Sequence, residues 1–249
     1  MNYTAKQVLT PPSVIGNGMI ARRFSLYRYQ NDVVIFASGV SNSREIRPEA
    51  FYREKQLIEQ TLGWLSGRLL VYFSTTSLYD PSEQHSLYNQ HKVEMEELIR
   101  SRVRRYLIVR VSNVVGGSGN PHTVFNYFWD HIQQGKLFMI WKNTTRNLID
   151  IDDFYEAVEQ AITRSAYHNQ TYIIANPHSV SPIQIVEAIE QHTGKKGNYK
   201  QVNKGTSFKI DTQIQDLLTF DLIYWRPDQY ILRLLTKYYL PDKPPAHVL

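Results

Sequence analysis

The chain has no cysteine among its 249 residues. Disulfide bonds, thiolate metal sites and a cysteine nucleophile are therefore excluded by counting. Long apolar runs are also missing, because no stretch approaches the roughly 20 apolar residues of a membrane span. Residues 1–10 lack the apolar core of a secretory signal. These absences predict a cytoplasmic protein with no membrane partner, and the sequence shows no cluster of metal ligands.

Acidic residues are fewer than basic ones, which leaves a formal net charge of +5. Such a charge favours anionic ligands in general: nucleic acid, a phospholipid surface or a phosphorylated small molecule. The densest basic cluster comprises Arg100, Arg102, Arg104 and Arg105. It falls at the end of a predicted helix, where cations interact favourably with the helix dipole, and no stacking aromatic residues interrupt it. We interpret it as a solvated helix end and predict no nucleic-acid partner.

Short β-rich segments alternate with amphipathic segments along the chain. In the amphipathic segments apolar residues recur every three or four positions, which is typical of helices. The β-rich segments are apolar almost throughout at 33–37 and 69–73, as strands covered on both faces are. The alternation predicts an α/β fold with a parallel sheet and helices on both faces. The expected strands are Pro12–Gly16, Asp32–Ser38, Arg68–Ser74, Tyr106–Ser112 and Thr171–Ala175, and the expected helices are Gly18–Tyr29, Pro48–Leu65, Leu87–Ser101 and Asp152–Thr163.

A G-x-G-x-x-A motif lies between the first expected strand and the first expected helix. Gly16 permits a tight turn, Gly18 lets the backbone approach a pyrophosphate, and Ala21 allows close helix packing. An ordinary glycine turn is the alternative for the motif taken alone. Only sixteen residues separate Gly16 from Val33, so the strand that usually carries a ribose-binding acid is hard to find. We therefore expect the part of a dinucleotide site that holds the adenosine to be abbreviated. Arg22 and Arg23 there either reach a 2′-phosphate of the adenosine ribose or are simply exposed.

Tyr88 and Lys92 have the spacing Y-x-x-x-K at the start of an expected helix, one turn apart on one face. A neighbouring ammonium stabilises a phenolate, so the pair suits proton transfer, although a chain with 17 tyrosines produces such a spacing by chance. The strand that ends in Ser74 and Thr75 adds hydroxyl groups at the carboxyl edge of the sheet, where ligands bind in such folds. Together these features indicate a catalytic centre.

The motifs occur in the order typical of the extended short-chain dehydrogenase/reductase family, which the sequence resembles over most of its length. The matching segments are Gly16 to Ala21, Phe36 to Gly39, Ser74 to Tyr79, Tyr88 with Lys92, Val109 to Asn113, Arg146 to Asp153, and Tyr224 to Pro227. The resemblance implies a shortened, Rossmann-like doubly wound sheet with a small C-terminal α+β substrate lobe. It also implies NAD or NADP as cofactor.

The resemblance assigns roles residue by residue. It implies Thr75, Tyr88 and Lys92 as catalytic residues, and Asn113 and Arg146 as substrate-binding residues. The implied cofactor-binding residues are Gly16, Asn17, Gly18, Met19, Ile20, Ala37, Ser38, Gly39, Ser74 and Lys92. The alternatives to substrate binding are that Asn113 only closes a turn and that Arg146 is only a surface charge. For Asp152 we favour a helix N-cap, and we expect His91 to be exposed because it points away from the Tyr88 face.

The same resemblance divides the chain. Residues 1–113 with parts of 147–175 are expected to bind the dinucleotide. Residues 114–146 and 176–240 are expected to form the substrate lobe, and residues 241–249 a proline-rich tail. Association of two copies through the helix that carries Tyr88 is an implied option.

Several reactions of the family are disfavoured by missing residues. Dehydratases carry Asp and Glu after the catalytic threonine, whereas this chain has Thr76 and Ser77 there. The dual epimerase-reductases need a cysteine. The favoured interpretation is an NAD(P)-dependent reductase of a nucleotide-linked keto sugar. A nucleotide-sugar epimerase with tightly held NAD, and a degenerate nucleotide-binding or regulatory relative without turnover, are the alternatives.

Overall fold

A five-stranded parallel sheet is the centre of the computed structural model, which describes residues 11–117, 123–218 and 224–239. The strand order is β1-β2-β3-β4-β8. The bounds are β1 Val14–Ile15, β2 Val33–Phe36, β3 Leu69–Thr75, β4 Tyr106–Val111 and β8 Gln170–Ile174. Each lies within two residues of an expected strand at both ends, and the predicted parallel sheet is confirmed.

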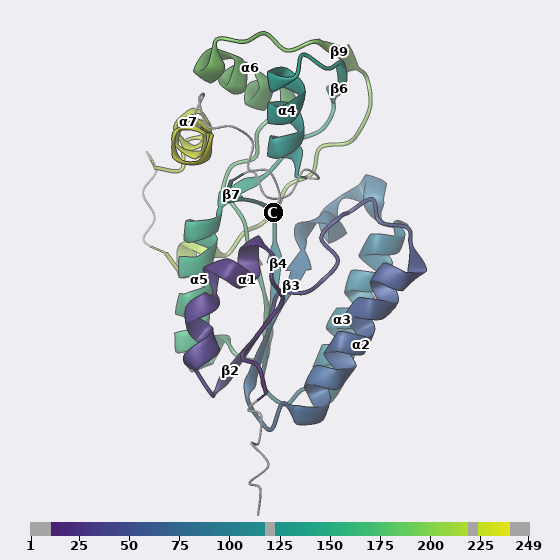
Figure 1. The fold of residues 1–249 in the computed structure, drawn as a ribbon, viewed down its shortest axis with the longest axis vertical. Helices are drawn as coiled ribbons and strands as arrows, with labels where there is room; N and C mark the ends of the chain where they lie inside the picture. Colours follow the sequence, from purple (N-terminus) through teal and green to yellow (C-terminus); the bar gives the residue numbers. More distant parts are fainter. Residues whose placement is uncertain (1–10, 118–122, 219–223, 240–249) are drawn as a thin grey trace, which may run out of the picture.

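Helices cover both faces of this sheet. Figure 1 shows α1 and α5 on one face and α2 and α3 on the other. Their bounds are α1 Met19–Arg23, α2 Pro48–Trp64, α3 Leu87–Arg102 and α5 Ile151–Thr163. The helix expected at 18–29 is instead a short α-helix followed by the 3₁₀ helix η1 (Ser25–Tyr29). Across the two helices the buried residues Ala21, Phe24 and Tyr27 recur every three positions, which is the period of a 3₁₀ helix.

Alternate side chains of the strands build a hydrophobic cluster on each face. On the α1 and α5 side, Phe73 of β3 packs against Phe24 and Phe154. On the α2 and α3 side, Leu70 and Tyr72 belong to the second cluster. Burial on both faces is why the central strands are apolar almost without interruption. The sheet is thus a rigid platform for the loops at its carboxyl edge.

The sheet is shortened at β1. In doubly wound folds of this kind the first strand lies inside the sheet, with neighbours on both sides. Here β1 pairs with β2, and it stands at the end of the sheet formed by the described residues. The short separation between Gly16 and Val33 indicated this feature, because it leaves room for one helical segment only.

Figure 1 shows α4, α6, α7, β6 and β9 beyond the carboxyl ends of the sheet strands. Two further parallel pairs form, β5 (Asn113–Val115) with β7 (Leu148–Asp150) and β6 (Phe138–Trp141) with β9 (Tyr199–Val202). The other helices are α4 Val124–Gln133, α6 Pro182–Thr193 and α7 Pro227–Tyr238, and the other 3₁₀ helices are η2 Thr76–Tyr79, η3 Pro81–Glu83, η4 Ser165–Tyr167 and η5 Ile214–Asp216. The substrate lobe stays a prediction, and the expected tail lies outside the described residues. None of the described helices is long and apolar enough to cross a membrane.

Candidate active site

Four neighbouring strands deliver the predicted site residues to one edge of the molecule. Gly16 follows β1, Ala37 follows β2, Thr75 ends β3, and Asn113 comes two residues after β4. Because these strands are parallel and adjacent, their carboxyl ends meet at the same edge. That edge is where ligands bind in open α/β sheets.

The loop of residues 16–18 between β1 and α1, the glycine loop, brings the backbone after β1 into close contact with the backbone after β2. Gly16 has a φ of +123°, and a Cβ atom there would lie 2.4 Å from the carbonyl oxygen of Ala37. Gly18 is different: it precedes α1, and a Cβ there would meet no heavy atom within 4 Å. Gly16 is therefore required by the fold, while Gly18 leaves a cradle open beside the first turn of α1. These residues fit a dinucleotide pyrophosphate.

The other residues predicted for the cofactor surround this loop. Asn17 accepts a hydrogen bond from exposed Arg22 through its carbonyl oxygen, at 3.2 Å. Met19 and Ile20 are half-buried in α1. Ser38 accepts hydrogen bonds from the guanidinium of Arg53 through its hydroxyl and its carbonyl oxygen.

Of the two arginines considered for a 2′-phosphate, Arg23 is already engaged. Its Nε lies 2.5 Å from Asp152, and its guanidinium stacks 3.7 Å from the ring centroid of Tyr155. Arg22 remains exposed beside the loop. Arg22 is therefore the better candidate of the two for contact with a phosphate.

Tyr88 and Lys92 lie together on the buried side of α3, as their spacing predicted. The helix begins after Ser86, whose hydroxyl accepts a hydrogen bond from the amide of Asn89. The Lys92 Nζ lies 5.8 Å from the centroid of the Tyr88 ring. Within the described part of the chain, the Tyr88 hydroxyl makes no hydrogen bond, so it is available to a ligand.

The ammonium of Lys92 is held by the buried carboxylate of Glu54. Its Nζ lies 3.0 Å from Oε1 of Glu54 and 3.2 Å from the hydroxyl of Tyr72. Glu54 also accepts hydrogen bonds from the Val40 amide, the Tyr72 hydroxyl and His91 Nε2. Burial tends to raise the pKa of Glu54, but the charge of Lys92 and these hydrogen bonds outweigh it and hold the pKa well below its usual range. Glu54 is therefore ionised.

Glu54 and Tyr72 were not predicted from the sequence, and His91 was predicted in the wrong environment. The expectation that His91 is exposed is wrong: the side chain is 6 % exposed, because its ring packs on Phe51 and bonds Glu54. One signal was present in the sequence. Glu54, Ile58 and Thr61 follow helical spacing and are the buried residues of α2, so a carboxylate occupies a position on the core-facing stripe.

The hydroxyl groups after β3 have separate partners. Ser74 donates to the buried carboxylate of Glu96 at 2.6 Å, which occupies its proton. Thr75 accepts a hydrogen bond from the Ser77 amide through Oγ1, which also lies 3.0 Å from the Ser77 hydroxyl. Thr75 is half-buried at the start of η2. Of these two hydroxyls, Thr75 is the better placed for a ligand, because its side chain is half-buried whereas Ser74 is buried.

The two predicted substrate-binding residues differ in how far their side chains are already engaged by the protein. Asn113 donates to the carbonyl oxygen of Asn147 at 2.9 Å, which links β5 to β7. Arg146 is half-buried, and burial lowers its pKa. Its guanidinium contacts the Thr145 carbonyl oxygen at 3.4 Å and forms no ion pair with any carboxylate of residues 11–117, 123–218 or 224–239. A partly desolvated cation without a counterion suits an anionic ligand.

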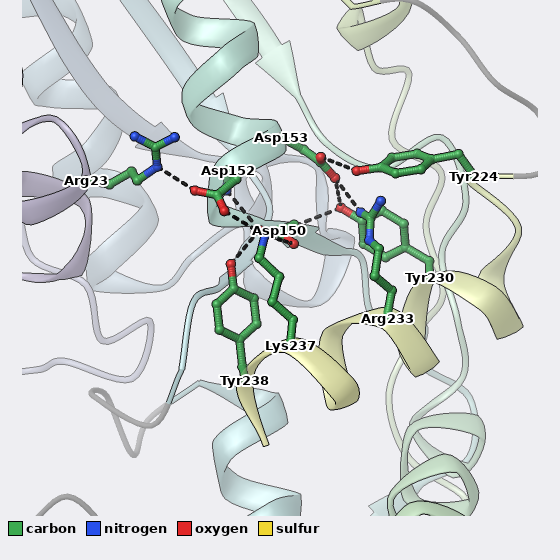
Figure 2. A network of polar contacts seen from close by, with 9 residues as sticks. All are labelled: Arg23, Asp150, Asp152, Asp153, Tyr224, Tyr230, Arg233, Lys237 and Tyr238. Atoms are coloured by element: carbon green, nitrogen blue, oxygen red, sulfur yellow. Dashed lines mark hydrogen bonds and ion pairs between the residues drawn. The ribbon is translucent and has the colours of Figure 1, made fainter. Parts of the chain in front are cut away.

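The expected N-cap role of Asp152 is wrong, because α5 begins at Ile151 and its cap is Asp150. Asp150 accepts the amide of Asp152, and Asp152 itself pairs with Arg23 and Lys237. Figure 2 shows the larger network in which three aspartates at the start of α5 meet side chains of α7. Its members are Arg23, Asp150, Asp152, Asp153, Tyr224, Tyr230, Arg233, Lys237 and Tyr238. The segment that resembles a family motif thus fastens α7 to α5 and α1.

Comparison with known proteins identifies the family and the fold. The model of the NAD dependent epimerase/dehydratase family matches residues 21–175. No sequence among the curated proteins matches the chain.

Several solved structures have a similar fold. One is UDP-glucuronic acid 4-epimerase from Bacillus cereus, bound to UDP-glucuronic acid and NAD. Its TM-score is 0.68, and it is 18% identical over 90% of this chain and 77% of that one. A UDP-galactose 4-epimerase has a TM-score of 0.65 and 16% identity over 84% and 79% of the two chains. RMD from Pseudomonas aeruginosa, complexed with NADPH, has a TM-score of 0.67 and 14% identity over 90% and 97%.

Proposed function

The chain belongs to the NAD dependent epimerase/dehydratase family, and on this premise we propose that it reduces a keto group of a nucleotide-linked sugar with NADH or NADPH. The observation that carries the proposal is the Tyr88 hydroxyl, which has no hydrogen-bond partner in the described residues and lies beside the fixed ammonium of Lys92. Similar structures hold NAD or NADPH, and some of them also hold a UDP-linked sugar such as UDP-glucuronic acid.

Each proposed role follows from the position of a side chain. The bound nicotinamide supplies the hydride that the carbonyl carbon receives. Tyr88 donates its proton to the carbonyl oxygen and regains it from solvent, while the Thr75 hydroxyl holds the same oxygen. Gly16 and Gly18 shape the cradle for the cofactor pyrophosphate. Arg146 offers its uncompensated charge to the substrate diphosphate, and Asn113 lines the same edge.

The surroundings of Thr75 favour reduction over dehydration. The two following residues, Thr76 and Ser77, carry no carboxylate, and Ser77 donates its proton to Asn89. Epimerisation uses the same residues but needs a cofactor that stays bound through the cycle. Among the described residues β1 is the end strand, so the sheet lacks the strand that usually supports the adenosine half, which supports an exchanging cofactor. Purified protein that carries stoichiometric NAD would count against the reductase.

The substrate assay separates these reactions. The protein is incubated with NADH or NADPH and a panel of nucleotide 4-keto and 4-hydroxy sugars, and the products are analysed by mass spectrometry and NMR. Reduction adds two hydrogen atoms to the sugar, whereas epimerisation leaves the mass unchanged. Nucleotide sugars that all return unaltered would contradict both.

Tyr88→Phe tests the proton donor. We expect kcat to fall about 10²–10⁴-fold, because the phenyl ring cannot donate a proton, while the dissociation constant of the dinucleotide stays unchanged. Tyr29→Phe is the control, since Tyr29 is exposed in η1, away from the site. Turnover of Tyr88→Phe at the wild-type rate would refute the assignment.

A degenerate relative without turnover is the second candidate, and the shortened sheet, in which β1 is the end strand of the described residues, favours it. Such a protein would bind the dinucleotide and give no product with any sugar of the panel. Association of two copies through α3 also remains a proposal, supported by the exposed apolar side chains of Leu87 and Val93.

A further inference from the structure

Helix α2 buries a carboxylate where a core-facing apolar residue is usual. Glu54 is 0 % exposed. Removing a carboxylate from water is costly unless hydrogen bonds and charges compensate it fully. Here both oxygens are satisfied: Oε1 by the Tyr72 hydroxyl and Lys92 Nζ, and Oε2 by the Val40 amide and His91.

These four donors come from different parts of the predicted site. Val40 follows the loop 37–39 after β2, Tyr72 lies in β3, and His91 and Lys92 lie in α3. Glu54 therefore fastens the loop that is predicted to lie beneath the cofactor to the helix that carries Tyr88. Gly39 shows how tightly they meet, since a Cβ there would lie 2.7 Å from Lys92 Nζ and 2.9 Å from Glu54 Oε1.

The contacts also fix the direction of the lysine head group. An ammonium has three N–H donors, and Glu54 and Tyr72 take two of those of Lys92. Their oxygens lie 2.7 Å apart on one side of the ammonium, so they fix its rotation about the Cε–Nζ bond and with it the direction of the remaining donor. A donor fixed in advance loses less entropy when it binds a ligand.

We propose that Glu54 is a positioning residue, which orients Lys92 and the loop 37–40 for the ribose beside the nicotinamide. The inference deepens the proposed function and rests on it. Glu54 touches neither substrate nor cofactor, and it acts through the Lys92 ammonium and the Val40 amide.

Glutamine cannot replace Glu54 at this site. All four neighbours are donors, whereas an amide offers one accepting oxygen and one donating nitrogen. In one orientation the amide nitrogen of Glu54→Gln faces the donors Val40 and His91. In the other orientation it faces the donors Lys92 and Tyr72. One of the two held segments must shift.

The test is isothermal titration of the full chain with NADH and with NADPH, which gives the dissociation constant and the binding-competent fraction separately. We expect Glu54→Gln to weaken binding about tenfold or more and Glu54→Asp, which keeps the charge, to recover part of that loss. Glu190→Gln is the matched control. Glu190 is also buried and accepts from a lysine, Lys196, and from a backbone amide, that of Gly197, but it lies on α6.

The outcomes separate the proposals. A purely structural role would reduce the competent fraction or the melting temperature while the dissociation constant of the folded protein stayed at the wild-type value. That result with Glu54→Gln, or with Glu54→Asp if the glutamine variant does not fold, overturns the inference, as does equal weakening by Glu190→Gln. Wild-type protein that binds neither dinucleotide refutes the proposed function itself.

Discussion

Single residues of the glycine loop have different constraints although they stand two positions apart. Gly16 has a positive φ and touches Ala37, whereas Gly18 faces open space with an ordinary φ of −70°. Gly16→Ala is expected to destabilise the fold by about 1–3 kcal/mol, because the residue is strained and displaces the loop after β2. Urea unfolding measures this loss.

Gly18→Ala is the matched variant of that experiment. It should leave the free energy of unfolding within about 0.5 kcal/mol of the wild type. It should nevertheless weaken dinucleotide binding, because a methyl group enters the open cradle. Equal stability of the two variants would show that the contact between Gly16 and Ala37 is unimportant.

At this scale the sequence was informative where chemistry is local. Tyr88 and Lys92 were predicted to share one helix face because their spacing carries that geometry, and they lie together on the buried side of α3. Glu54 was not predicted, because a glutamate within a helix is ordinarily solvated, and its four donors come from segments far apart along the chain. The partners of a buried charge are set by tertiary structure and are not encoded in the local pattern.

Among the elements, α7 is held by charges as well as by its apolar face. Arg233 lies 2.7 Å from Asp153 and stacks on the rings of Tyr224 and Tyr230. Arg233→Met should lower the free energy of unfolding by about 2–4 kcal/mol, because a largely buried carboxylate loses its cation. Chemical denaturation followed by circular dichroism measures the change.

The same helix offers a control for that substitution. Arg226 pairs with Asp228 at 3.4 Å, and both side chains are exposed. Arg226→Met should change the free energy of unfolding by less than about 1 kcal/mol. If both variants lose the same amount, the network of Figure 2 does not stabilise α7.

The element boundaries show a similar division between what the sequence reveals and what it hides. The central strands and α2 were predicted closely, because continuous apolar runs and an amphipathic pattern are local signals. The start of α5 was misjudged: Asp150, Asp152 and Asp153 are equally good caps by composition. The backbone decides between them, because Asp150 is extended and accepts the amide of Asp152.

For the whole molecule, buried carboxylates determine the response to acid. Burial opposes ionisation of Glu54 and Glu96, but their cationic and hydrogen-bonding partners hold both pKa values below the ordinary 4.5. The unfolded chain therefore binds protons first as the pH falls, and the stability that these groups contribute is present above pH 4.5 and lost below it.

Melting temperatures measured between about pH 6 and pH 3 test this expectation. The wild type should lose stability steeply toward acid. Glu96→Gln should start from a lower melting temperature, because Arg110 and Arg100 lose their counterion, and should then show a flatter decline. A parallel decline of the two proteins would contradict a folded-state pKa depression at Glu96.

The end position of β1 has a thermodynamic consequence for the whole chain. Among the described residues β1 has a neighbour on one side only, and a two-residue strand held in this way opens at a lower free energy than the interior strands β3 and β4 do. The glycine loop continues this strand, so a ligand that binds the loop must also keep the strand closed. Part of the free energy of ligand binding then offsets the cost of ordering β1. The measured affinity therefore depends on how well β1 is ordered as well as on the contacts between ligand and loop.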